Sequence, residues 1–167
     1  MSSAYPSTRP KILIAGGGLV GNTLALALAA RGLAVTLVEP RTAAPDQCDP
    51  ADTRHLALAE GSVLALQRLG VWPALAESAG AIRRVEVSRR GAPGQLRLDA
   101  AEHGFERFGA VVPAPLLLRA LDQKVADCAL IEVLTGVRVE YSEAGNQLRR
   151  VMLSDGSTRE VALLVAA

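Results

Sequence analysis

The sequence predicts an α/β fold that begins with a β-strand, an α-helix and a second β-strand in series. The first strand is expected at residues 12–15, an apolar run of the length typical of a buried strand. The helix is expected at residues 22–31, which are rich in alanine and leucine, and Gly32 is placed to end it. Residues 34–38 then predict the second strand, and Glu39 stands at its end.

The segment between the first strand and the helix carries the glycine pattern of a dinucleotide-binding turn. Its sequence, GGGLVG, matches G-x-G-x-x-G. In this motif Gly16 would permit a tight turn, Gly18 would let a pyrophosphate approach the backbone, and Gly21 would let helix and strand pack closely. The helix N-terminus offers N–H groups to the phosphates, and Glu39 lies where an acid accepts hydrogen bonds from a ribose. The pattern therefore predicts a Rossmann-like dinucleotide site.

Two other interpretations of this stretch stay open at the level of sequence. Residues 12–30 are uncharged and are flanked by Arg9, Lys11 and Arg31, which also suits a signal peptide or a membrane span. The second strand and Glu39 favour the βαβ unit, because a targeting segment would not need them. A glycine turn that serves packing alone is the other alternative, and Glu39 argues against it.

Composition narrows the classes of partner. Half of the 167 residues are apolar, enough for the core of one domain of ordinary size. Lys and Arg number 18 against 17 Asp and Glu, and aromatic residues make up 3%, so we expect no nucleic-acid partner. Cys48 and Cys128 have no metal or redox spacing, which suits reduced thiols in a cytoplasmic protein. His55 and His103 are too isolated to predict a metal site or a catalytic role.

The middle of the chain predicts helices around a hairpin. A helix is expected at residues 62–69, where a serine can cap it, and a shorter one at about 71–78. Residues 82–90 and 95–98 read as strands on either side of the turn signal Gly-Ala-Pro-Gly. A second long helix is expected at residues 115–126, with a proline in its first turn and leucines on one face.

The last part of the chain predicts a strand, a β-meander and a return to the sheet. An apolar strand is expected at 129–134, followed by alternating segments at 136–141 and 148–153. Residues 161–167 form a final apolar run with no helix after it. Because parallel sheets usually have both faces covered, we expect a piece of a longer chain. An incomplete sheet would expose apolar edges, so self-association is also expected.

Several of these segments together resemble the flavoprotein aromatic monooxygenases, the para-hydroxybenzoate hydroxylase class, and within it the ubiquinone-biosynthesis hydroxylases of the UbiH type. The similar segments are ILIAGGGLVGNTLALALAARG, TLVEP, DTRHLALAEGSVLALQRLGVW, PLLLRAL and LLVAA. The resemblance implies an FAD-binding domain over residues 11–81 and 110–167, which includes the meander. It implies that residues 82–109 begin the sheet of a substrate domain, and that residues 1–10 are a flexible leader.

The same resemblance implies which residues bind FAD. Gly16, Gly18 and Gly21 would form the pyrophosphate turn, and Glu39 would bind the adenosine ribose. The remaining implied contacts are Arg54 near the flavin, Arg119 at the pyrophosphate, and the backbone of Val137 at the adenine. Arginines suit this task, because charge-assisted hydrogen bonds to phosphate are strong. Without the resemblance, both arginines would be interpreted as ordinary solvated side chains.

The resemblance also implies a reaction. Full-length members bind FAD, reduce it with NAD(P)H, and use O₂ to hydroxylate an aromatic ring, which for the UbiH type belongs to a prenylated phenol. No residue of this chain is assigned a catalytic role, and later family motifs are absent, so we expect the chain alone to be inactive. A cytoplasmic protein, peripheral to the inner membrane or part of a biosynthetic complex, is implied. An NAD(P)-dependent reductase and a non-catalytic chain are the alternatives.

Overall fold

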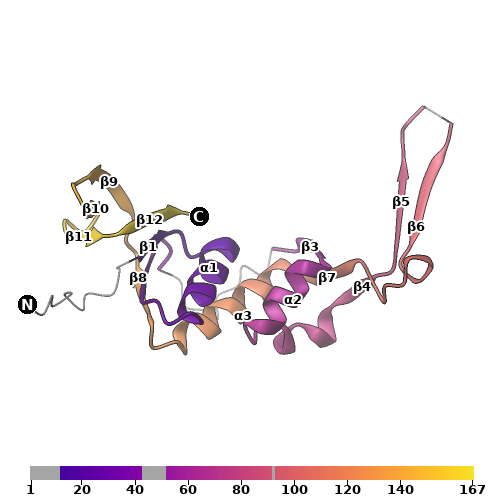
Figure 1. The fold of residues 1–167 in the computed structure, drawn as a ribbon, viewed down its shortest axis with the longest axis horizontal. Helices are drawn as coiled ribbons and strands as arrows, with labels where there is room; N and C mark the ends of the chain where they lie inside the picture. The colour runs from indigo at the N-terminus through magenta and orange to yellow at the C-terminus, as the bar shows by residue number, and fades with distance from the viewer. Residues whose placement is uncertain (1–11, 43–51, 92) are drawn as a thin grey trace, which may run out of the picture. The chain divides into compact units, whose positions relative to one another are not determined.

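The computed structural model describes residues 12–42, 52–91 and 93–167. The chain divides into two compact units, one formed by Met1–Gln47 with Leu121–Ala167 and the other by Cys48–Ala120. The expected leader, most of the loop after Glu39, and Cys48 lie outside the described residues. The first unit combines a helix with a parallel sheet and a meander, and the second consists of small antiparallel sheets and short helices. Figure 1 traces both units along the chain.

The first unit is built on a four-stranded parallel sheet with the strand order β12-β1-β2-β8. Its strands are β1 (Ile12–Ala15), β2 (Val35–Glu39), β8 (Ile131–Thr135) and β12 (Leu163–Ala166). The register pairs Ile14 with Leu37 on one side and with Val165 on the other. Helix α1 (Leu19–Ala29) connects β1 to β2, which confirms the βαβ unit expected from sequence.

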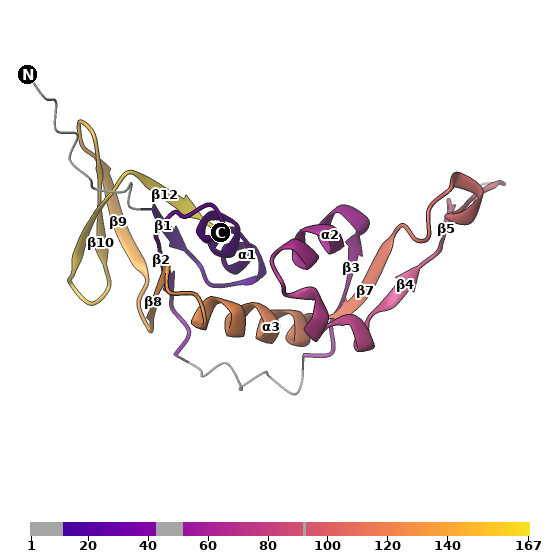
Figure 2. The ribbon, with the colours of Figure 1, turned by 60° about the horizontal axis from the view of Figure 1, so that its bottom comes forward.

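A three-stranded antiparallel meander covers one face of this sheet. It consists of β9 (Val139–Ala144), β10 (Arg149–Leu153) and β11 (Thr158–Val161). Buried Leu13 and Val38 of the sheet pack against Val151, Leu153 and Val161 of the meander. Figure 2 shows α1 on the opposite side of the sheet from the meander. Each fully buried Leu or Val side chain contributes about 1.5–3 kcal/mol, so this cluster anchors the sheet from which the glycine turn emerges.

The second unit holds two small antiparallel sheets and short helices. One sheet has the order β3-β7-β4 and the other pairs β5 with β6. The strands are β3 (His55–Ala59), β4 (Gly80–Ile82), β5 (Arg84–Ser88), β6 (Gln95–Asp99) and β7 (Gly109–Pro113). The helices are α2 (Glu60–Arg68) and the 3₁₀ turns η1 (Trp72–Ala74), η2 (Ala76–Ser78) and η3 (Ala101–His103). Helix α3 (Ala114–Ala126) leads from this unit back into the first.

Several element boundaries differ from the sequence-based expectation. Helix α1 begins at Leu19, three residues early, because Gly18 adopts the extended conformation of an N-cap. The strand expected at 82–90 divides between β4 and β5, which pair with different strands. The final apolar run divides between the meander and the parallel sheet, since Val161 pairs with Arg149. Local patterns do not specify which partner a strand joins, so these divisions required the tertiary fold.

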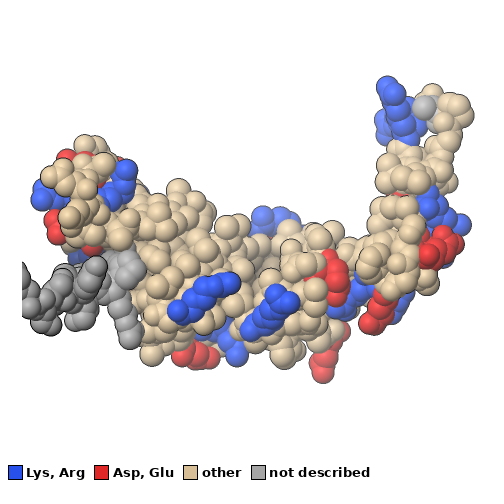
Figure 3. All heavy atoms as spheres, in the orientation of Figure 1, with Lys and Arg blue, Asp and Glu red and all other residues tan. Residues whose placement is uncertain are grey.

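On the face drawn in Figure 3, no large patch of positive or negative charge is seen among the described residues. Basic and acidic side chains form small separate groups among uncharged ones. This agrees with the near balance of charges in the sequence. None of the described helices is both long and apolar enough to span a bilayer. Residues 12–30, which sequence alone left open as a membrane span, form β1, the glycine turn, the 11-residue helix α1 and its C-cap Ala30.

Candidate functional site

The glycine turn lies between the end of β1 and the start of α1, and two of its glycines are required by packing. Gly16 has a φ of +115°, which L side chains rarely adopt, and its N–H donates to the Val38 carbonyl at 2.8 Å. A Cβ at Gly16 would collide with the Ala167 carbonyl oxygen. A Cβ at Gly21 would collide with the Gly16 carbonyl oxygen. Gly16 and Gly21 therefore allow β1, α1 and the end of β12 to meet.

Gly18 differs from both, because a Cβ at this position would meet no atom within 4 Å. The first backbone hydrogen bond of α1 runs from the Asn22 N–H to the Gly18 carbonyl at 3.0 Å. Amides at the start of a helix have no acceptor within the helix, and they carry partial positive charge. Open space above a bare backbone, next to such amides, fits a phosphate group.

Glu39, at the carboxyl end of β2, faces the turn. Its Oε2 accepts a hydrogen bond from the Gly17 N–H at 2.6 Å, and its Oε1 accepts from the backbone N–H and Nε of Arg41 at 2.8 and 2.7 Å. A Cβ at Gly17 would lie only 2.8 Å from Glu39 Oε2, so this middle glycine lets the carboxylate approach. Burial raises the pKa of Glu39, but the hydrogen bonds from Arg41 and Gly17 outweigh it and hold the pKa below its ordinary value.

The segment that contains Val137 lies beside the end of β2. Gly136 has a φ of +72°, and its N–H donates to the Arg41 carbonyl at 3.4 Å. Val137 follows it, half-buried, and packs against the cluster formed by the sheet and the meander. Gly16, Gly18, Gly21, Glu39 and Val137 thus lie at or shortly after the carboxyl ends of parallel strands, where ligands bind in open α/β sheets.

Arg54 and Arg119 belong to the second unit. Arg54 donates to Asp52 through Nε at 2.8 Å and Nη2 at 2.7 Å, and its side chain is 77% exposed. The hydrogen bond from Arg54 lowers the pKa of Asp52 to about 2. Arg119 lies exposed on α3, and among the described residues it has no ion-pair partner. Their roles at the cofactor stay predictions.

Three polar residues near the turn were not singled out by sequence reasoning: Arg41, Asn22 and Asp122. Asn22 is 1% exposed, the one fully buried polar side chain among the described residues. Its Nδ2 donates to Asp122 Oδ1 of α3 at 2.6 Å. The signal available in sequence was slight, namely a polar residue within an apolar helix and an arginine two positions after Glu39.

Burial is the main cause that raises the pKa of Asp122, and Glu39 adds to it, while Asn22 and Arg41 act in the opposite direction. An acid with a raised folded-state pKa favours the protonated native state. The protonated Asp122 carboxyl contributes fully to stability below its pKa in the unfolded chain, near 3.8. This contribution is lost as pH rises through its pKa in the folded protein. The ionised carboxylate therefore costs stability at neutral pH.

We expect Asp122→Asn to be more stable than the wild type at pH 7, because asparagine mimics the protonated acid and can still accept from Asn22. The advantage should shrink as pH falls through the folded pKa and vanish below about 3.8. Denaturant unfolding between pH 7 and 3.5 measures it. Asp155→Asn is the matched control and should lower stability at pH 7, since the hydrogen bond from Ser157 lowers the pKa of Asp155. An Asp122→Asn chain that is less stable at pH 7 would contradict the argument.

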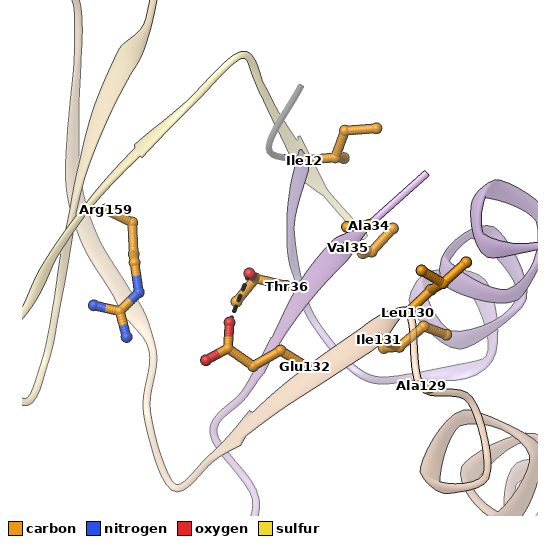
Figure 4. Close-up of a pocket in the computed structure, with 9 residues that line it drawn as sticks. All are labelled: Ile12, Ala34, Val35, Thr36, Ala129, Leu130, Ile131, Glu132 and Arg159. Atoms are coloured by element: carbon orange, nitrogen blue, oxygen red, sulfur yellow. Dashed lines mark hydrogen bonds between the residues drawn. The ribbon is translucent and has the colours of Figure 1, made fainter. Parts of the chain in front are cut away.

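A separate cavity of about 400 Å³ lies at the other end of the sheet (Figure 4). It is lined by the amino-terminal ends of β1, β2 and β8, and the Thr36 hydroxyl donates to Glu132 Oε2 at 3.0 Å on its wall. Because the glycine turn and Glu39 lie at the carboxyl ends of these strands, this cavity is not part of the dinucleotide site.

Comparison with known proteins identifies the family of the chain. The family model described as FAD binding domain matches residues 9–166. The 3-demethoxyubiquinol 3-hydroxylase of Escherichia coli is 39% identical over 115 residues, which cover 68% of this chain and 29% of that protein. The ubiquinone hydroxylase UbiM of Neisseria meningitidis is 28% identical over 98% of this chain and 36% of its own length.

Solved structures agree at the level of the fold. The p-nitrophenol 4-monooxygenase PnpA of Pseudomonas putida superimposes with a TM-score of 0.73 at 16% identity, over 95% of this chain and 40% of that one. The chain spans less than half the length of these proteins. The match of the family model over nearly the whole sequence shows that the chain belongs to the FAD-binding domain family.

Proposed function

We propose that this chain is the FAD-binding portion of a flavin-dependent monooxygenase that hydroxylates an aromatic ring, a prenylated phenol of ubiquinone biosynthesis. The observation that carries the proposal is the open backbone at Gly18 beside the start of α1, opposite the ionised Glu39. The relatives named as ubiquinone hydroxylases support the substrate class. When bound, FAD would supply the redox and oxygen chemistry, and NAD(P)H is the proposed reductant.

Each proposed contact follows from the chemistry of the residue. The turn of Gly16, Gly18 and Gly21 binds the pyrophosphate through backbone N–H groups, and Glu39 accepts from the adenosine ribose. The backbone at Val137 lies at the adenine. Arg54 and Arg119 are proposed at the flavin and the pyrophosphate, where guanidinium groups suit anionic oxygens.

The proposal also covers the division of the chain into domains and its location in the cell. Residues 11–81 and 110–167 form the FAD-binding domain, and the β5–β6 hairpin within 82–109 begins the substrate-domain sheet. An isolated two-stranded sheet is marginally stable in water, which supports a larger sheet around this hairpin. A cytoplasmic protein that associates with the inner membrane or a biosynthetic complex suits a prenylated substrate.

Titration of FAD into the purified 167-residue chain, followed by flavin fluorescence, tests the proposal. We expect binding that weakens about tenfold or more in Glu39→Ala, because a hydrogen bond to a charged group contributes about 1.5–3 kcal/mol. Glu77→Ala, which removes an exposed carboxylate of η2, is the matched control and should bind as the wild type does. Binding of NADH in preference to FAD would favour the alternative, an NAD(P)-dependent reductase. A folded chain that binds neither would contradict a self-sufficient site.

A further inference from the structure

The side chain of Arg41 links the two segments that form the ribose end of the site. Its Nε donates to Glu39 Oε1 at 2.7 Å, and its Nη2 donates to the Gly17 carbonyl at 2.9 Å. Glu39 ends β2, whereas Gly17 lies in the turn after β1. One guanidinium group therefore connects the carboxyl ends of two neighbouring parallel strands.

The hydrogen bonds to the Glu39 carboxylate are distributed unequally between its oxygens. An ionised carboxylate offers about four acceptor positions, two on each oxygen. Oε1 accepts from the backbone N–H and from Nε of Arg41, at 2.8 and 2.7 Å, so both of its positions are used. Oε2 accepts only from the Gly17 N–H at 2.6 Å among the described residues. The remaining acceptor position of Glu39 is on Oε2, on the side of the glycine turn.

Arg41 itself is not part of the core. Its side chain is 51% exposed, whereas that of Glu39 is 14% exposed. An exposed arginine bonded to a nearly buried carboxylate is expected to affect the orientation of that carboxylate more than the stability of the fold. The planar guanidinium can donate to Glu39 and to the Gly17 carbonyl at once, which the single ammonium of a lysine does less well.

We infer that Arg41 is a positioning residue for the dinucleotide: by occupying Oε1 and holding the Gly17 carbonyl, it leaves Glu39 Oε2 as the acceptor for a ribose hydroxyl. This inference rests on the proposed function, since the ribose is that of the bound dinucleotide. Arg41 acts through Glu39 and does not need to touch the ligand. Its effect is to pre-orient the carboxylate before binding, which lowers the cost of ordering the site.

A double-mutant cycle tests whether Arg41 acts through Glu39. FAD titrations compare the wild type, Arg41→Ala, Glu39→Ala and the double variant. We expect Arg41→Ala to weaken FAD binding about tenfold in the wild-type background and to have no further effect in the Glu39→Ala background, because the two residues act as one unit. Arg41→Lys should recover part of the loss. Arg150→Ala removes an equal charge from an exposed side chain of β10 and should leave the affinity unchanged.

Ribose discrimination gives a readout that loss of general stability would not change. Bound FAD is displaced with ADP and, separately, with 2′-deoxy-ADP. The wild type should bind ADP more tightly than 2′-deoxy-ADP, and the ratio of the two affinities should approach one in Arg41→Ala. A preference that Arg41→Ala leaves intact would overturn the inference. Equal losses of FAD affinity in both backgrounds would overturn it too, since Arg41 would then contact the ligand directly.

A measurement without ligand separates this inference from the proposed function. The pKa of the Glu39 carboxyl is followed by ¹³C NMR, and Arg41→Ala should raise it because the side-chain hydrogen bond and the charge of Arg41 are lost, while the backbone N–H remains. If FAD binds while Arg41→Ala leaves that pKa unchanged, the positioning role alone is wrong. If the wild type binds neither FAD nor ADP, the proposed function is wrong and the ligand role of Arg41 falls with it.

Discussion

Gly18→Ala is expected to remove most FAD binding while leaving the fold intact. A Cβ at this position meets nothing within 4 Å, and the φ of −80° suits alanine. The loss of glycine at an N-cap costs stability, whereas the lower entropy of the unfolded chain offsets part of that cost, so the net change in stability should stay within about 1 kcal/mol. The added methyl group would stand where the pyrophosphate is proposed to approach the backbone. We expect affinity to fall by a factor of about 100 or more, the equivalent of a lost pair of charge-assisted hydrogen bonds.

Fluorescence titration and denaturant unfolding of the same preparation measure both parts of this result. Gly61→Ala is the matched control, because Gly61 also has open space around its Cβ position and lies in α2, outside the proposed site. It should bind FAD as the wild type does. Equal affinity in the wild type and Gly18→Ala would place the pyrophosphate away from this turn and would leave the open space at Gly18 without a ligand.

Gly21→Ala is expected to destabilise the protein strongly. The added Cβ would collide with the Gly16 carbonyl oxygen and would lie 3.0 Å from the Gly16 carbonyl carbon. Both are backbone atoms at the end of β1, so no side chain can rotate away, and α1 would have to move off the sheet. We expect a loss of about 3 kcal/mol in the free energy of unfolding, at the upper end of the range for overpacking. Urea unfolding followed by far-UV circular dichroism measures it.

Gly61→Ala is the control for this variant too, and its expected effect on stability is opposite to that of Gly21→Ala. Gly61→Ala makes an identical change within a helix but meets open space, so it should stabilise the chain by up to about 1 kcal/mol. The comparison separates the helix propensity of alanine from the collision at Gly21. If Gly21→Ala were as stable as Gly61→Ala, the close approach of α1 to the turn would not be needed for folding.

Much of the first unit could be predicted because its signals are local. The apolar run of β1, the three spaced glycines and the acid at the end of β2 lie within about 30 consecutive residues, where each element constrains the next. The meander and α3 were predicted in outline from alternation and from an apolar helix face. Element ends were less accurate, as at Leu19, because the start of a helix depends on the backbone conformation of its N-cap.

Most of the contacts that sequence reasoning missed join residues far apart in the chain. Asn22 and Asp122 are separated by 100 positions, and nothing in either segment indicates the other. Arg41 lies close to Glu39 in sequence, yet its bond to the Gly17 carbonyl depends on β1 and β2 being adjacent in the sheet. The closeness of Gly17 to Glu39 has the same origin.

The sequence by itself determined the βαβ unit, the glycine turn and the presence of an acid beyond it, because backbone freedom at glycine and the period of apolar residues are properties of the local chain. The motif predicted the packing role of Gly21, but the tertiary structure alone decided which backbone atoms a Cβ at Gly16 or Gly21 would meet and that Gly18 faces open space. It also decided that Arg41 occupies one oxygen of Glu39 and leaves the other available. The physical reason is that steric room and hydrogen-bond occupancy depend on which atoms other segments bring within a few ångströms.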